Sequence, residues 1–84
     1  MNYSVIVDVT LREGIADPEG STIERALPAL GFTGVTNVHA GKCFRFDVEA
    51  PDEAAALEKA AALAERLLSN PVIENASARL SQRG

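Results

Sequence analysis

Large aromatic side chains and cysteine are scarce in this chain of 84 residues. It has no tryptophan, one tyrosine and three phenylalanines, so few bulky side chains are available for a core. The single cysteine, Cys43, cannot form an internal disulfide, which argues against a small secreted scaffold held by such bonds. One cysteine and one histidine also cannot supply a structural zinc site, and an iron–sulfur cluster needs four thiolates.

Basic residues and long apolar runs are scarce as well. Eight lysines and arginines stand against twelve acidic residues, and the basic ones are scattered along the chain. Nucleic-acid binding requires clustered basic residues, so we expect no nucleic-acid partner. No apolar run reaches the roughly 18 residues of a membrane span. The first residues lack the basic region and apolar run of a signal peptide. We therefore expect a cytoplasmic protein with no membrane partner.

The first half of the chain predicts a strand, a helix and a hairpin. Apolar and polar residues alternate over 3–11, which is typical of a strand. Asp17 can cap a helix whose apolar stripe runs to a stop at Gly31, and Ser21 with Glu24 offers a second capping arrangement. Pro28 should bend or shorten this helix. Residues 35–40 and 43–49 predict two strands joined by a tight turn.

The second half predicts a long helix and a last strand. The helix opens near residue 52 and ends before Asn70 and Pro71, and the strand covers 72–80. Residues 81–84 should form a frayed tail. We expect the apolar face of the helix to consist of Leu57, Ala60, Ala61, Ala64, Leu67 and Leu68.

The resulting order, β-α-β-β-α-β, predicts one α+β domain over residues 1–84 with a ferredoxin-like fold. This fold has a four-stranded antiparallel sheet with two helices on one face. The opposite sheet face would mix apolar and charged residues, which suits a partner or solvent about equally well. Its expected members are Ile6, Asp8, Arg45, Asp47, Ile73 and Arg79.

A search for catalytic chemistry finds no constellation. We interpret His39 as a surface residue and Cys43 as a small, half-buried strand residue, since no nucleophile–base pattern surrounds them. The acidic residues at the two helix starts are explained by capping and the helix dipole. A phosphate could bind at Gly41 and Lys42 beside Arg45, but a plain turn is the favoured interpretation. We therefore predict no catalytic, cofactor-binding or metal-binding residue.

Three local patterns, in this order and spacing, resemble the PurS family. They are Asp17-Pro18-Glu19-Gly20 after the first strand, Val38-x-x-Gly41-Lys42 in the hairpin, and Leu67-Leu68-x-Asn70-Pro71-Val72-Ile73-Glu74 between the long helix and the last strand. The resemblance covers about residues 3–80. PurS is the small subunit of phosphoribosylformylglycinamidine synthase, an enzyme of purine biosynthesis.

The resemblance implies a role in a larger ligase. That enzyme converts formylglycinamide ribonucleotide, glutamine and ATP to formylglycinamidine ribonucleotide, ADP, phosphate and glutamate. A glutaminase subunit releases ammonia, and a large synthetase subunit consumes it with ATP and magnesium. The resemblance implies that the small subunit is a non-catalytic assembly subunit, which self-associates to a dimer or tetramer, bridges the other two subunits and supports ammonia transfer. No cofactor is expected on this chain.

Six residues match or adjoin the family motifs and are candidate contact or structural positions: Asp17, Gly20, Gly41, Lys42, Arg45 and Asn70. The chain departs from the family in its last strand, where Ala76 and Ala78 stand in place of frequent aromatic residues. Two other functions share the predicted topology. One is an ACT-type module that binds a small regulatory molecule. The other is an acylphosphatase, for which Arg12 would be the phosphate-binding residue.

Overall fold

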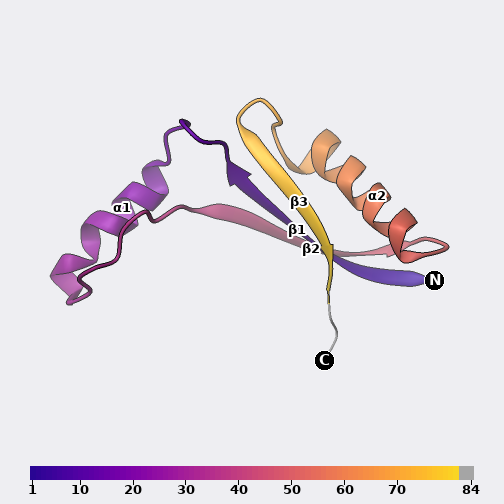
Figure 1. The fold of residues 1–84 in the computed structure, drawn as a ribbon, viewed down its shortest axis with the longest axis horizontal. Helices are drawn as coiled ribbons and strands as arrows, with labels where there is room; N and C mark the ends of the chain where they lie inside the picture. Colours follow the sequence, from indigo (N-terminus) through magenta and orange to yellow (C-terminus); the bar gives the residue numbers. More distant parts are fainter. Residues whose placement is uncertain (82–84) are drawn as a thin grey trace.

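The computed structural model describes residues 1–81, and its centre is a three-stranded antiparallel sheet with the order β2-β1-β3 (Figure 1). β1 pairs with β2 from Asn2 opposite Glu49 to Thr10 opposite Gly41, and with β3 over its second half. The strands span Asn2–Leu11 (β1), Gly41–Glu49 (β2) and Glu74–Leu80 (β3).

The alternation along β1 decides which sheet face is covered. Val5, Val7 and Val9 are at most 1% exposed and lie beneath helix α2 (Glu53–Leu63). Asp52 caps this helix, as expected, and its carboxylate accepts the Ala55 N–H at 2.8 Å. The helix buries small residues at every fourth position, so that it can lie close to the sheet. The buried core consists of Val5, Val7, Val9, Val48, Ala50, Ala56, Ala60 and Ala64.

The helical segment predicted to end before Asn70 closes with a π-helical turn. The five residues that follow α2 form this turn, η2 (Ala64–Leu68). The Ser69 N–H and hydroxyl close it, and both donate to the Ala64 carbonyl at 2.9 Å. The expected apolar face was wrong at two positions: Ala61 and Leu67 are exposed, whereas Ala56 is buried. The buried residues that face the sheet, Ala56, Ala60 and Ala64, are spaced four apart, and neither Ala61 nor Leu67 falls on this spacing.

Helix α1 (Pro18–Ala26) is shortened where the sequence predicts it. The α-helix stops at Ala26, and Pro28 opens a single 3-10 turn, η1 (Pro28–Leu30), because a proline cannot supply the N–H that would continue the helix. Gly31 ends the turn with a φ of +89°, the left-handed conformation that glycine adopts without strain. The prediction for Pro28 and Gly31 is confirmed.

The predicted fourth strand is absent from the sheet described for residues 1–81. Residues 35–40 carry no ladder pairing, and positive φ angles at Gly34 (+79°) and Asn37 (+63°) interrupt the extended backbone just before and within the segment. The four-stranded sheet is therefore replaced by three strands.

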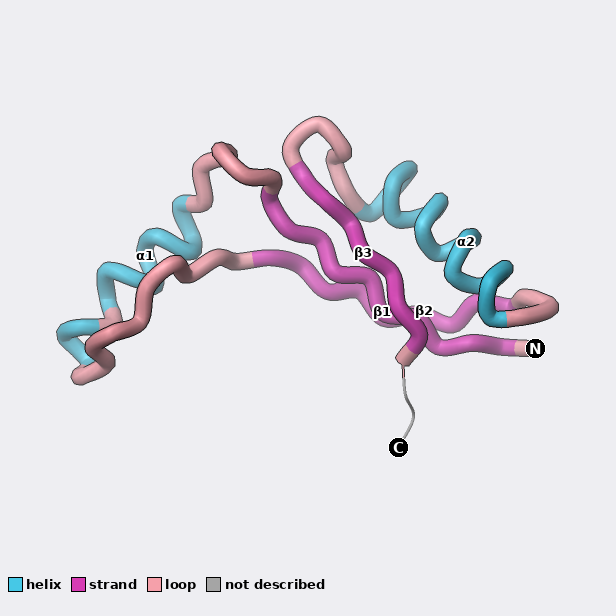
Figure 2. The backbone as a smooth tube through the Cα atoms, in the orientation of Figure 1, coloured by secondary structure: helices cyan, strands magenta, loops and turns pink. Residues whose placement is uncertain are grey.

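The placement of two helices on one sheet face was also wrong. α2 packs on all three strands, whereas α1 packs on η1 and has no comparable packing against the sheet. Figures 1 and 2 show α1 and the segment that returns from it extending away from the sheet, at the opposite end of the molecule from α2. We call residues 17–40 the arm.

The junction before β3 is a turn rather than a strand. The Asn70 carbonyl accepts the Ile73 and Glu74 N–H groups, and the Asn70 side chain accepts the Val72 N–H at 3.1 Å. The last strand therefore begins at Glu74, two residues later than predicted. Val72 is 81% exposed, and Val72 and Ile73 both lie outside the sheet.

The sheet face opposite α2 carries charged and polar pairs, and Ile73, which was predicted on this face, lies outside the sheet. Asp8 and Arg79 form an ion pair across the strands, and the Ser4 hydroxyl donates to Asp47 at 2.8 Å. Of the predicted tail, only Ser81 is described, and its N–H donates to the Ser4 carbonyl. Over residues 1–81, every helix is too short or too polar to cross a bilayer.

We expect Val7→Ala to destabilise the chain strongly, because Val7 is fully buried and the core described for residues 1–81 holds eight buried apolar residues. Removing two methyl groups from such a site costs about 2 kcal/mol. Urea unfolding would measure the loss. Val72→Ala, at an 81% exposed site, is the matched control and should change the free energy of unfolding by less than about 0.5 kcal/mol. Equal effects would contradict the assignment of the core.

Candidate functional site: the clamp at the base of the arm

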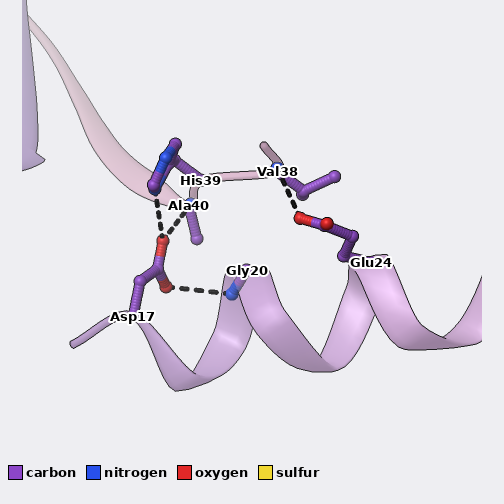
Figure 3. A network of polar contacts seen from close by, with 6 residues as sticks. All are labelled: Asp17, Gly20, Glu24, Val38, His39 and Ala40. Atoms are coloured by element: carbon purple, nitrogen blue, oxygen red, sulfur yellow. Dashed lines mark hydrogen bonds and ion pairs between the residues drawn. The ribbon is translucent and has the colours of Figure 1, made fainter. Parts of the chain in front are cut away.

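One carboxylate joins the two segments that form the arm. Asp17 caps α1, and its Oδ1 accepts the Gly20 N–H at 2.9 Å. Its Oδ2 accepts the Ala40 N–H, also at 2.9 Å, from the segment that returns toward β2 (Figure 3). The Asp17 side chain is only 10% exposed. A single residue therefore starts the helix and ties down the chain 23 positions later.

Two further contacts complete this arrangement. Glu24, one turn after Gly20, accepts the Val38 N–H on its Oε1 at 2.9 Å. His39 places its Nδ1 3.5 Å from Asp17 Oδ2, close enough for an ion pair when the imidazole is protonated. We call these residues the clamp: Asp17, Gly20, Glu24, Val38, His39 and Ala40 (Figure 3).

Hydrogen bonding holds Asp17 in its charged form. The Gly20 N–H, followed by the Ala40 N–H and the nearby His39, lowers the pKa of Asp17 below its ordinary value of 3.8. Both carboxylate oxygens are already bound to the protein's own backbone. The clamp is therefore arranged to hold the arm rather than to transfer a proton to a substrate.

Gly20 is required by the close approach of the two arm segments. It is buried, and a Cβ built at this position would lie 2.4 Å from the Val38 carbonyl oxygen and 2.6 Å from Asp17 Oδ2. Any larger residue must push the returning segment away from α1. This explains the glycine at a helical position, where alanine would otherwise be favoured.

The two hairpin candidates lie where the arm meets the sheet. A Cβ at Gly41 would lie 2.7 Å from the Val9 carbonyl oxygen, so glycine permits the close start of the β1–β2 ladder. Lys42 places its Nζ 3.8 Å from Glu74 Oε2 on the far strand β3. A hollow of about 250 Å³ lies between the arm and the sheet at this point. Its lining includes Asp17, Gly41, Lys42 and Glu74.

The structure brings four of the six predicted residues together and leaves two apart. Asp17, Gly20, Gly41 and Lys42 meet at the base of the arm. Arg45 lies farther along β2 and lines a different hollow on the sheet, and Asn70 organises the turn before β3. Neither of these two residues contributes to the clamp.

Sequence reasoning placed two other residues incorrectly. Cys43 is exposed rather than half-buried. Ser21 with Glu24 offered a second capping arrangement beside the Asp17 cap, but the Glu24 carboxylate accepts the Val38 N–H instead. A glutamate seven residues after a capping aspartate gives no signal of that contact, because the fold of the returning segment creates it. The Val38 and Ala40 N–H groups were missed for the same reason.

The lowered pKa makes the clamp sensitive to acid. A carboxylate whose pKa is lower in the folded state than in the unfolded state stabilises the fold fully at pH values above the unfolded-state pKa of 3.8. This stabilisation is lost as the pH falls through the folded-state pKa. We expect the Gly20 and Ala40 amide proton shifts to titrate together in NMR spectra, with a midpoint below 3.8. Asp17→Asn should abolish both titrations, because the amide that replaces the carboxylate does not ionise in this range. A midpoint at or above 3.8 would contradict the clamp.

We expect Gly20→Ala to loosen the arm. The new methyl group would overlap a backbone carbonyl, and overpacking of this kind costs about 1–3 kcal/mol, against about 1 kcal/mol gained in helix propensity. The overlap at 2.4 Å with a backbone atom places the cost in the upper part of that range, so a net loss of up to about 2 kcal/mol should lower the melting temperature by several degrees in circular dichroism. Ser21→Ala, at the exposed neighbouring position, is the matched control. If both variants melt together, the close approach at Gly20 has no energetic consequence.

Comparison with known proteins identifies the family. The profile of the PurS family, described as phosphoribosylformylglycinamidine (FGAM) synthase, matches residues 4–82. Two sequence relatives are each named phosphoribosylformylglycinamidine synthase subunit PurS. The protein from Archaeoglobus fulgidus is 45% identical, with 84% of this chain and 89% of the relative covered. The protein from Synechocystis is 40% identical, with 88% and 74% covered.

Solved structures agree with this result. The purS subunit of the Thermotoga maritima synthase superposes with a TM-score of 0.89 at 33% identity, covering 96% of this chain and 93% of that one. A chain of the structure of PurLQS from the same organism superposes with a TM-score of 0.88 at 33% identity, covering 96% and 99%. These matches give no support to an ACT-type module. With sequence, fold and spacing in agreement over nearly its whole length, this chain belongs to the PurS family.

Proposed function

We propose that this chain is the PurS subunit of a cytoplasmic phosphoribosylformylglycinamidine synthase in purine biosynthesis. Its role is to assemble a glutaminase subunit with a large synthetase subunit, and it self-associates while doing so. The observation that carries the proposal is the likeness to a chain of the Thermotoga maritima PurLQS structure, with a TM-score of 0.88 over 96% of this chain.

The chemistry of the described residues supports an assembly role. Charged side chains that could act on a substrate are engaged in holding the fold: Asp17 in the clamp, Lys42 with Glu74, and Asp8 with Arg79. Over residues 1–81, no three histidine, cysteine, aspartate or glutamate side chains come together as a metal-binding group. The proposal therefore assigns ATP and magnesium to the other subunits and no cofactor to this chain.

Arg12 also has a structural contact in place of a phosphate. Its Nε donates to the Pro71 carbonyl at 2.9 Å, and its backbone N–H donates to the Ile73 carbonyl, so it joins the end of β1 to the turn before β3. This is the residue on which an acylphosphatase would depend.

Assembly has a chemical purpose in a glutamine-dependent ligase. Ammonia released at one active site is protonated and lost if it reaches bulk water, so the two active sites must be docked along a path closed to solvent. A small subunit that fixes the docking can support this transfer without any reactive group of its own.

Reconstitution tests the proposal. We expect the glutaminase and synthetase subunits to show glutamine-dependent product formation that falls at least about tenfold when this chain is omitted, while synthesis from added ammonium salt is retained. Product and glutamate are measured in parallel. Adding back the chain, either wild type or with the exposed-site change Val72→Ala, should restore the activity fully. Unchanged glutamine-dependent synthesis without the chain would refute the proposal.

A further inference from the structure

All three family motifs reach one hollow at the base of the arm. The hollow has a volume of about 250 Å³. Its lining takes residues from the first motif (Asp17, Pro18 and Glu19), from the second (Gly41 and Lys42) and from the third (Glu74). The clamp, the start of the β1–β2 ladder and the turn before β3 account for parts of each motif, but none of them uses Glu19. Three segments that are distant in the sequence therefore build a shared recess that the fold alone does not explain.

The size and the apolar lining of this hollow suit a single side chain. Val9 and Leu11 of β1 line it, together with the small residue Ala40 from the returning segment. Sites for small-molecule ligands are usually larger, about 300–1,000 Å³. Lysine and arginine side chains lay their aliphatic stems along apolar surface and keep their charged ends in polar surroundings. The hollow offers both environments side by side.

The charges around the hollow are unbalanced. The Glu74 side chain is only 11% exposed, and its Oε2 lies 3.8 Å from the Nζ of Lys42, which is 61% exposed and has room to swing toward solvent. Glu19 is exposed, and within residues 1–81 no basic side chain pairs with it. With Asp17, three carboxylates stand against one ammonium group. The excess of negative charge beside an apolar lining favours a cationic side chain.

We propose that this hollow receives a lysine or arginine side chain from an enzyme subunit of the synthase. The stem of that side chain packs on Val9 and Leu11, and its charged end lies between Glu19 and Glu74, in place of the Lys42 ammonium group. The inference rests on the proposed function and deepens it, because it names where an enzyme subunit is held and the chemistry that holds it.

The charge of the chain favours an enzyme subunit over a second copy as the source of this side chain. The net charge is −4, so two copies repel each other at long range. Basic side chains are few, and Arg12, Lys59 and Arg79 already contact oxygen atoms of their own chain. A basic surface on another protein complements this chain both at long range and at the hollow.

Charge reversal at the rim of the hollow tests the proposal. Biolayer interferometry measures binding of the chain to a mixture of the glutaminase and synthetase subunits. Glu19→Lys should raise the dissociation constant about tenfold or more, because a cation then faces the incoming cation. Glu58→Lys is the matched control, since it makes the same change at an exposed site of α2, and should alter the dissociation constant less than about twofold.

Lys42→Gln gives a prediction of the opposite sign. It removes the ammonium group that the incoming side chain replaces, so the dissociation constant should equal that of the wild type or fall below it. An acidic occupant would instead make Lys42→Gln weaken binding as Glu19→Lys does. Raising sodium chloride from about 50 mM to about 300 mM should weaken wild-type binding and narrow its difference from Glu19→Lys, because salt screens exposed charges.

Circular dichroism and sedimentation velocity of each variant complete the test. Glu19→Lys should keep the fold and the oligomeric state of the wild type. Glu19→Gln, which keeps the shape of the side chain, should weaken binding in the same direction by a smaller factor. The proposal is overturned if Glu19→Lys binds the enzyme subunits like Glu58→Lys or if Lys42→Gln weakens binding. It is also overturned if Glu19→Lys dissociates copies of this chain, since the occupant is then a second copy.

The two proposals fail separately. If the wild-type chain binds the enzyme subunits and Glu19→Lys binds them equally well, only the proposal for the hollow is refuted. If glutamine-dependent synthesis is unchanged without the chain, the assembly role is refuted whatever the charge variants show.

Discussion

The extended shape of this molecule depends on the carboxylate of Asp17. One of its oxygens caps the start of helix α1 and the other accepts the Ala40 N–H, so that the helix and the returning segment are held together. Residues 31–40 belong to no strand ladder, so the contacts of Asp17 and Glu24 with Ala40 and Val38 hold their path. The approach of the two segments leaves no room for a side chain at residue 20, which makes the glycine part of the same constraint.

The core has a consequence for the role of the chain. Four valines and four alanines bury little apolar area, and a domain of this size is only marginally able to stabilise itself. Holding α1 on the arm removes a helix that could have covered β2 and exposes its apolar side chains as well. Burial of the arm's exposed apolar side chains against a partner would add apolar burial that the single chain lacks. This suits a subunit that works only in an assembly.

The family motifs have structural explanations at the level of single residues. In the first motif, Asp17 and Gly20 belong to the clamp. In the second, Gly41 permits the close approach of β2 to β1 where their ladder begins. In the third, Asn70 accepts three backbone N–H groups and turns the chain into β3. These residues preserve the shape of the subunit, and its role in assembly depends on that shape.

Local physical chemistry was sufficient to predict most elements of this protein. Alternating valines predicted β1, Asp17 and Asp52 predicted the two helix starts, and Pro28 and Gly31 predicted the end of the first helix. Each signal acts within a few residues, so it can be read from the chain alone. The three-stranded sheet, the extended arm and the contacts of Glu24 and Asp17 with Val38 and Ala40 were decided by tertiary structure. They depend on the backbone conformations of Gly34 and Asn37 and on groups 14 to 23 positions apart, whose meeting no local pattern specifies.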